Sequence, residues 1–126
     1  MSRLLITPDP SLPGDDRDDG YIVAVTYRFT AMGAEWIIPC GFQTDGASIP
    51  TLFGLTWVVT YSKFHPCVMR AAVEHDWFCR VQPAGSDYKR AAARFEQVVI
   101  EDGGNATRAA MMHRAILIGG PKWGEA

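Results

Sequence analysis

The stretch that decides the first part of the fold is Tyr-Ile-Val-Ala-Val-Thr-Tyr-Arg-Phe-Thr, residues 21–30, because large apolar side chains occupy every second position in it. Successive side chains of an extended chain point to opposite faces, so this alternation is the pattern of a strand with one buried face. The strand over residues 21–30 is the clearest element that the sequence predicts. The residues of its predicted buried face are Tyr21, Val23, Val25, Tyr27 and Phe29.

The segments on either side extend this strand into a small sheet. Met32-Gly33-Ala34 can turn the chain into a second strand from Glu35 to Cys40, which gives an antiparallel hairpin. Pro39 has no backbone N–H, so it indicates an edge or a bulge in that second strand. Upstream, residues 3–7 predict a short strand, and residues 8–20 predict a loop because they gather prolines, glycines and acidic side chains.

Beyond this sheet the apolar side chains follow helical spacing. Pro66 suits the first turn of a helix, and Ser86 and Asn105 can each cap the N-terminus of another. Glycine pairs at 103–104 and 119–120 end the second and third helices. Strands followed by helices predict an α+β fold, in which three helices pack on one face of an antiparallel sheet. The predicted helices span residues 66–81, 86–102 and 105–119.

The composition is that of a globular protein. The chain has 126 residues, of which 48 % are hydrophobic and 21 % charged, and these values favour a single domain over residues 1–126. The net charge of −2 is too close to zero for a nucleic-acid binder that acts through its overall charge. A signal peptide and a long apolar run are both lacking, so we expect synthesis in the cytoplasm. The expected parts are a strand and an acidic loop over 1–20, a hairpin over 21–45 and a three-helix portion over 66–120.

Three cysteines, Cys40, Cys67 and Cys79, are an odd number and form no Cys-x-x-Cys pair. A disulfide framework or a zinc knuckle is therefore unexpected. All three are predicted to be buried thiols.

One segment with chemical potential joins the sheet to the helices. It reads Phe-Gln-Thr-Asp-Gly-Ala-Ser-Ile-Pro over residues 42–50. Asp45 can accept hydrogen bonds from backbone amides two residues on, and Ser48 can cap a turn, so turn formation is one explanation. Asp45 and Ser48 are also candidate catalytic residues, although no nucleophile motif such as Gly-x-Ser-x-Gly surrounds Ser48.

The second segment is Glu-His-Asp-Trp, residues 74–77, whose polar side chains interrupt an apolar helical run. Helical spacing places His75 and Asp76 side by side at the edge of the buried face. A histidine beside a carboxylate can act as an oriented general base or as a metal ligand. If Asp45 reaches this edge, Asp45, His75 and Asp76 offer nitrogen and oxygen ligands to a divalent metal that activates water.

A structural explanation of the same segment stays open. His75 can bond a backbone carbonyl, and Asp76 can pair with Arg80 one turn later. Cys79, four residues after His75, can either add a thiolate ligand or remain an ordinary buried thiol.

Aromatic and basic side chains raise two further possibilities. Large aromatic side chains form binding surfaces on many proteins, and Trp123, near the C-terminus, is best placed to be an exposed anchor. Lys89, Arg90 and Arg94 are expected on the outer surface of the second helix, where they can contact phosphates or be solvated. The candidate partner contacts are Trp57, Tyr61, Phe64 and Trp123.

Two motifs and their spacing point to a known family. Thr-Asp-Gly-Ala-Ser-Ile-Pro, residues 44–50, is followed some 25 residues on by Ala-Ala-Val-Glu-His-Asp-Trp-Phe-Cys-Arg, residues 71–80. A helix centred on Phe95 then ends at Asp-Gly. Over roughly residues 20–120 this order resembles the domain-of-unknown-function 1353 family. The resemblance implies a small protein encoded by a tailed bacteriophage or prophage.

The resemblance also implies an acidic residue in the second helix, three positions before the aromatic, where this chain has Ala92. A metal site that needs that acid would be incomplete, which favours a structural or binding role. We therefore expect a virion component of the tail or baseplate that binds other phage structural proteins. It would be made in the host cytoplasm, be incorporated in the virion and need no cofactor.

An enzyme is the alternative expectation. It would be a small metal-dependent hydrolase that acts during infection, for example on cell-wall material. Its zinc or manganese ion would be held by Asp45, His75 and Asp76.

Overall fold

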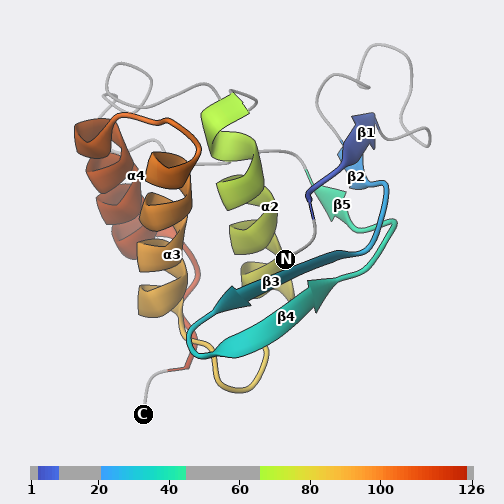
Figure 1. Ribbon diagram of the computed structural model, residues 1–126. Coiled ribbons are helices and arrows are strands. Elements are labelled where there is room, and N and C mark those ends of the chain that lie inside the picture. Colours follow the sequence, from blue (N-terminus) through green and yellow to red (C-terminus); the bar gives the residue numbers. More distant parts are fainter. Residues whose placement is uncertain (1–2, 9–20, 45–65, 125–126) are drawn as a thin grey trace. The chain divides into compact units, whose positions relative to one another are not determined.

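The computed structural model describes residues 3–8, 21–44 and 66–124 (Figure 1). Contacts within the chain divide it into two compact units, residues 1–46 and residues 47–126. The described strands belong to the first unit and the described helices to the second. An antiparallel N-terminal sheet and three C-terminal helices confirm the α+β class expected from the order of the elements. Within the described ranges, no helix has the length and apolar character needed to cross a membrane.

Three short strands of the first unit form an antiparallel sheet. β1 (Ile6–Pro8) pairs with β2 (Tyr21–Val23), and β2 pairs on its other side with β5 (Gln43–Thr44). In this register Ile6 lies opposite Val23 and Tyr21 opposite Thr44. The first strand expected over residues 3–7 is thus present but begins three residues later.

The predicted hairpin consists of β3 (Tyr27–Ala31) and β4 (Ala34–Ile38). Met32 and Gly33 form its turn, and both have positive φ angles, 53° and 73°. Two positive φ values in a two-residue loop match the right-handed twist of the flanking strands. Trp36 lies opposite Phe29, and its indole Nε1 donates a hydrogen bond of 2.8 Å to the carbonyl of Ala31 at the end of β3.

The single strand expected over residues 21–30 is interrupted at residues 24–26. Val25 is 52 % exposed instead of lying on the buried face. The chain bends here because β2 pairs with β1 and β5, whereas β3 pairs with β4 in a separate sheet. Tyr27 and Phe29 follow the predicted alternation and are buried.

Cys40 contacts this bend from the end of the hairpin. Its Sγ lies 3.2 Å from the carbonyl oxygen of Ala24, and its backbone N–H donates to Oγ1 of Thr26 at 3.4 Å. Cys40 is exposed, so the prediction of a buried thiol was wrong at this position. The residue lies in a connecting turn rather than in a core-facing strand position.

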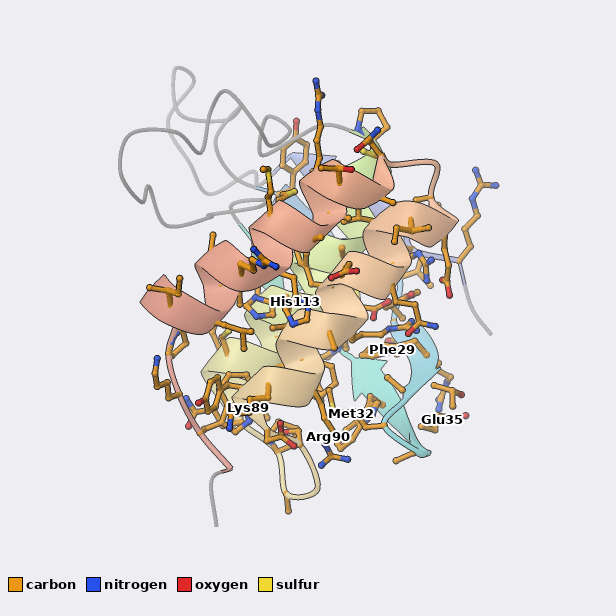
Figure 2. All side chains as sticks on the ribbon, turned by 90° about the vertical axis from the view of Figure 1, so that its left-hand side faces the viewer. Phe29, Met32, Glu35, Lys89, Arg90 and His113 are labelled. Atoms are coloured by element: carbon orange, nitrogen blue, oxygen red, sulfur yellow. The ribbon has the colours of Figure 1, made fainter. Side chains whose placement is uncertain are left out.

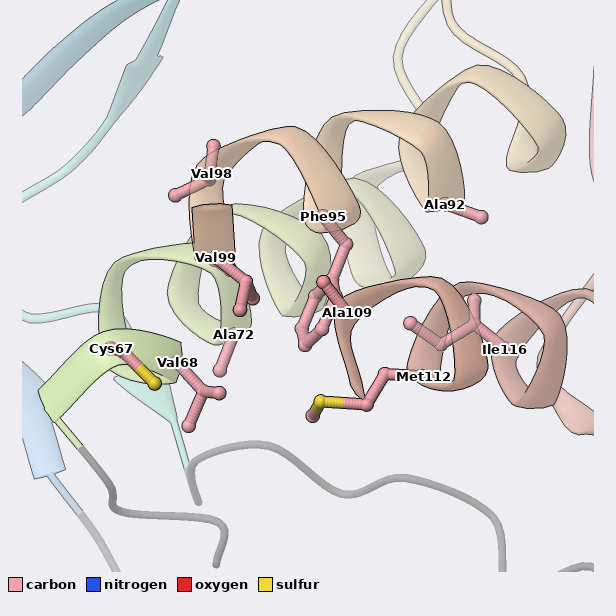
Figure 3. Packing of buried hydrophobic residues seen from close by; sticks show 11 residues of the cluster. Cys67, Val68, Ala72, Ala92, Phe95, Val98, Val99, Ala109, Met112 and Ile116 are labelled. Atoms are coloured by element: carbon pink, nitrogen blue, oxygen red, sulfur yellow. The ribbon is translucent and has the colours of Figure 1, made fainter. Parts of the chain in front are cut away.

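The second unit contains α2 (Pro66–Val81), α3 (Tyr88–Glu101) and α4 (Ala106–Gly119), which run in alternating directions (Figure 1). Helix α3 packs against both α2 and α4. Side chains from all three helices meet in one apolar core (Figure 3). Its buried members are Cys67, Val68, Ala71, Ala72, Ala92, Phe95, Val98, Val99, Ala109, Met112 and Ile116.

Capping side chains fix where the last two helices begin. Asn105 caps α4 as predicted, because its Oδ1 accepts from the backbone N–H groups of Thr107 and Arg108 at 2.9 and 3.1 Å. Helix α3 is capped by Asp87, whose Oδ1 accepts from the N–H of Arg90 at 2.8 Å. The prediction of Ser86 as this cap was wrong by one residue.

Trp123 is hydrogen-bonded at the N-terminus of α3. Its carbonyl accepts from the backbone N–H of Tyr88 at 3.1 Å, and its indole Nε1 donates to Oγ of Ser86 at 3.0 Å. Gly124 follows with a φ of +75°, and a Cβ there would lie 2.6 Å from Cβ of Asp87. Trp123 is only 9 % exposed, so the expected exposed anchor is instead part of the packing around the N-terminus of α3.

Candidate functional site in the helical unit

The candidate site described by the structure is the polar segment of α2 and the side chains around it. Asp45 lies outside the described residues, and its predicted approach to His75 stays a prediction. The other candidates outside the described residues are Ser48, Trp57, Tyr61 and Phe64.

Glu74 is the residue of this segment that enters the core. Its side chain is 1 % exposed, and it lies on a helical stripe with Cys67, Ala71 and Phe78, all of them buried. A buried carboxylate is strongly destabilising unless a charged or hydrogen-bonding partner compensates it. Glu74 therefore requires a cation nearby.

Arg94 of α3 supplies that cation. Its Nε donates to Oε1 of Glu74 at 2.8 Å, and its Nη2 donates to Oε2 at 3.4 Å. The Arg94 side chain is 10 % exposed, so the pair is largely removed from water. Two parallel N–H···O bonds hold the guanidinium and the carboxylate in one plane, which fixes α2 against α3.

Arg70 extends the pair into a network. Its Nη1 lies 3.7 Å from Oε2 of Glu74, one turn further along α2. Its Nη2 contacts Oε2 of Glu101 at 2.8 Å and Oδ1 of Asp102 at 3.0 Å, both at the end of α3. Arg70 holds the pKa of Glu101 below its usual value, since it stabilises the ionised carboxylate. Two arginines and three carboxylates thus join α2 and α3.

The prediction that Arg94 lies on the outer surface of its helix was wrong. Arg94 follows Ala91 by three residues and precedes Val98 by four, and both of these are buried. This helical spacing, together with the apolar stripe that contains Glu74, is the sequence signal that identifies the pair. One acid and one base at buried positions of neighbouring helices predict a buried ion pair.

His75 lies beside the core rather than in a charged pocket. Its ring meets Phe95 edge to face, with ring centroids 5.8 Å apart. Burial lowers the pKa of His75 to about 4, because the charged imidazolium loses its hydration there. The imidazole is therefore neutral at pH 7.

Cys79 faces the same imidazole. Its Sγ lies 3.6 Å from Nδ1 of His75. Burial, and then the negative charge of Asp76, raise the pKa of the Cys79 thiol to about 11. At pH 7 a neutral thiol thus lies beside a neutral imidazole, whereas a cysteine nucleophile needs a thiolate.

Asp76 forms the intrahelical pair expected as the structural alternative. Its Oδ2 lies 3.1 Å from Nη2 of Arg80, one turn along α2. Within residues 3–8, 21–44 and 66–124, no group of three or more His, Cys, Asp or Glu side chains has the arrangement of a metal site. Ala92, at the position where the family resemblance implies an acid, is completely buried in the apolar core.

A second feature lies along α3 and α4, which we call the α3–α4 groove. Its cavity has a volume of about 410 Å³. His113 of α4 points to α3 here (Figure 2), and its Nδ1 lies 2.8 Å from Oε1 of Glu96. His113 is not among the residues predicted from the sequence. The sequence signal for the groove is on α3, where residues at helical spacing place the small side chain of Ala93 at one end. The groove is lined by Ala93, Glu96, Gln97, Ile100, Glu101 and His113.

Comparison with known proteins gives a family match and two relatives. Residues 22–116 match the family described as "Protein of unknown function (DUF1353)". "Uncharacterized protein y4jT" of Sinorhizobium fredii is 32 % identical over 92 residues, which are 72 % of this chain and 26 % of that protein. "Uncharacterized protein y4iH" of the same strain is 31 % identical over 96 residues, 73 % of this chain and 36 % of that protein. The chain thus spans between a quarter and two fifths of the length of these curated relatives. No solved structure gives a significant match.

Proposed function

Because the chain belongs to the DUF1353 family, as its two motifs indicated, we propose that it is an accessory protein of a tailed phage or prophage. In this proposal it is a structural or assembly component of the virion, in the tail or baseplate. It acts by binding other phage proteins, without catalysis.

The observation that carries this proposal is the use of the family motif in α2 for internal contacts. Glu74 is bound by Arg94, His75 packs on Phe95, and Asp76 pairs with Arg80. These side chains hold helices together or stabilise one helix. Such a motif fits a rigid binding module better than a catalytic centre, which needs a reactive group that substrate can reach.

Two further observations favour a binding module. Large apolar side chains lie exposed on the helices, with Ile100 and Met111 each 42 % exposed and Ile118 64 % exposed. Such exposed apolar side chains are available for contact with a partner protein. The matched region also makes up only a part of the longer relatives. A unit used in proteins of different lengths is typical of a domain that contributes one contact to a larger assembly.

The test is whether the chain is part of the particle. Phage induced from a lysogen that carries the gene would be purified on a density gradient, and its proteins identified by mass spectrometry. We expect peptides of this chain at a constant ratio to tail proteins across the particle peak. Its absence from the peak, in a preparation where the tail proteins are detected, would overturn the proposal whatever the effect of deleting the gene.

The hydrolase alternative is favoured by one observation. A neutral imidazole, as in His75, is the form that binds a metal ion, and the Sγ of Cys79 lies 3.6 Å from its Nδ1 on α2. Metal analysis of protein purified without chelator tests this alternative. It requires about one equivalent of zinc or manganese that is lost in His75→Ala and kept in His113→Ala, the matched histidine control. The binding proposal expects no stoichiometric metal in any of these proteins.

A further inference from the structure

The α3–α4 groove has an apolar floor and an acidic rim. Ala93 and Ile100 are seven residues apart on α3, so they lie on one stripe two turns apart, and Glu96 and Gln97 lie between them. The small Ala93 side chain leaves room at one end, and Ile100 is 42 % exposed at the other. The cavity of about 410 Å³ falls in the size range of ligand pockets.

The charges around this groove are unequally distributed. Arg94 and Arg70 point to Glu74 and to the end of α3, so these two cations are engaged between α2 and α3. The groove lining contains two carboxylates, from Glu96 and Glu101, and no lysine or arginine. The lining therefore carries more acidic than basic side chains.

Glu96 keeps one carboxylate oxygen for a further bond. Its Oε1 contacts Nδ1 of His113 at 2.8 Å. Among the described residues, no side-chain contact involves its other oxygen, Oε2. Both oxygens of Glu101, by contrast, are engaged, Oε2 by Arg70 at 2.8 Å and Oε1 by Gln97 at 3.2 Å. Glu101 thus contributes negative potential, and Glu96 contributes the acceptor.

We propose that the α3–α4 groove receives an arginine side chain of a partner protein. The guanidinium would donate to Oε2 of Glu96, and the three methylene groups of the side chain would lie over Ala93 and Ile100. An arginine combines a planar fork of N–H donors with an apolar stem, which matches a carboxylate at the rim of an apolar floor. This inference rests on the proposed function and specifies the kind of side chain that the partner presents.

Titration followed by NMR tests the inference on the purified full chain. Increasing N-acetyl-arginine amide would be added to ¹⁵N-labelled protein, with N-acetyl-lysine amide and N-acetyl-norleucine amide in parallel. We expect saturable shifts of backbone amides in residues 93–101 and around His113 with the arginine compound. The lysine compound should bind more weakly, and the apolar norleucine compound should give no saturable shift. Shifts that do not saturate, or that are equally large at acidic residues elsewhere such as Glu35, would overturn the inference.

Matched variants locate the site. Glu96→Gln should raise the dissociation constant about threefold to fivefold, as expected for the loss of one exposed ion pair. Glu35→Gln removes another exposed carboxylate, on the hairpin, and should leave binding unchanged. Ala93→Leu should abolish binding by filling the groove, whereas Ala106→Leu adds the same bulk at an exposed position outside it. Equal binding by the wild type and Ala93→Leu would exclude this groove.

The two proposals can fail separately. Saturable arginine binding by a chain that is absent from phage particles would leave the groove intact and overturn the virion role. A chain that is present in particles but gives no saturable shift would keep the virion role and overturn the arginine site.

Discussion

The two sides of α3 place ionisable side chains in different environments. On the side of α2, Arg94 pairs with Glu74, and the two side chains are 10 % and 1 % exposed. On the side of α4, Glu96 pairs with His113, and these side chains are 31 % and 24 % exposed. Both pairs have a closest contact of 2.8 Å, so their difference is one of hydration and not of distance.

Hydration decides what each pair contributes. Removing one partner of a buried pair leaves a charge without water or counter-charge, whereas water replaces a missing partner at the surface. Removing either partner of the Glu74–Arg94 pair alone is therefore expected to destabilise the packing of α2 against α3. The Glu96–His113 pair can exchange its contacts with a ligand at little expense in stability.

The largest expected effect is at Glu74. Glu74→Ala leaves the guanidinium of Arg94 almost without solvent and without its carboxylate, and it opens a cavity in the core. We expect the free energy of unfolding to fall by about 3–5 kcal/mol. Urea denaturation followed by the helical signal in circular dichroism measures this change.

Two variants show whether the loss at Glu74 comes from the stranded charge. Glu35→Ala removes the partner of Arg28 on the hairpin, where both side chains are more than half exposed, and should change stability by less than about 1 kcal/mol. The double variant Glu74→Met with Arg94→Met replaces the buried pair with apolar groups and should recover most of the loss. A double variant as unstable as Glu74→Ala would show that shape, rather than charge, determines the effect.

The second effect concerns His75 and pH. The pKa of His75 is lowered to about 4 in the folded protein, against an ordinary value of 6.5 that the unfolded chain regains. Between these values the unfolded state binds more protons, so stability must fall as the pH decreases. We expect a loss of about 2 kcal/mol from this residue between pH 7 and pH 4.5.

The His75→Gln variant isolates this contribution. Asp87 and Glu101 also have lowered pKa values, and the stability they contribute is lost as the pH falls through their folded-state pKa values, below their ordinary 3.8 and 4.5. Their contribution is common to the wild type and the variant, and it cancels in the difference. An identical decrease in both proteins would mean that His75 is already hydrated in the folded state.

The sequence predicts elements whose signal is local. The bounds of α2 follow from Pro66 and the apolar run after it, and the start of α4 follows from Asn105, because a cap and a helical stripe act over a few residues. The break at Val25 does not follow from alternation, because it depends on which strands pair with β2 and β3. Which distant segments pair with each other depends on the tertiary structure, and the alternation of apolar residues along one strand does not determine it.

The candidate site shows the same limit more sharply. The sequence identified the polar segment of α2 and its pair Asp76–Arg80, a contact within one helix. The sequence predicts His75 as the functional residue of this segment, whereas the most buried residue is Glu74. The partner of Glu74 is Arg94, twenty residues later on α3. Trp123 was likewise expected to be exposed, because nothing in its neighbourhood reveals the hydrogen bond to Ser86. Long-range partners decide whether a polar or aromatic side chain is buried.

The smallest expected effect on stability is at Glu96. Glu96→Gln keeps the shape of the side chain and an oxygen that can accept from His113, but it removes the charge. We expect the free energy of unfolding at pH 7 to change by about 0.2–1 kcal/mol, far less than for Glu74→Ala. The same urea experiment measures the change in the free energy of unfolding for both variants, so the two values can be compared directly. A loss above about 2 kcal/mol would place the Glu96–His113 pair in the same class as the buried pair. In that case the α3–α4 groove would be a structural joint of the helical unit, unable to exchange its contacts with a ligand.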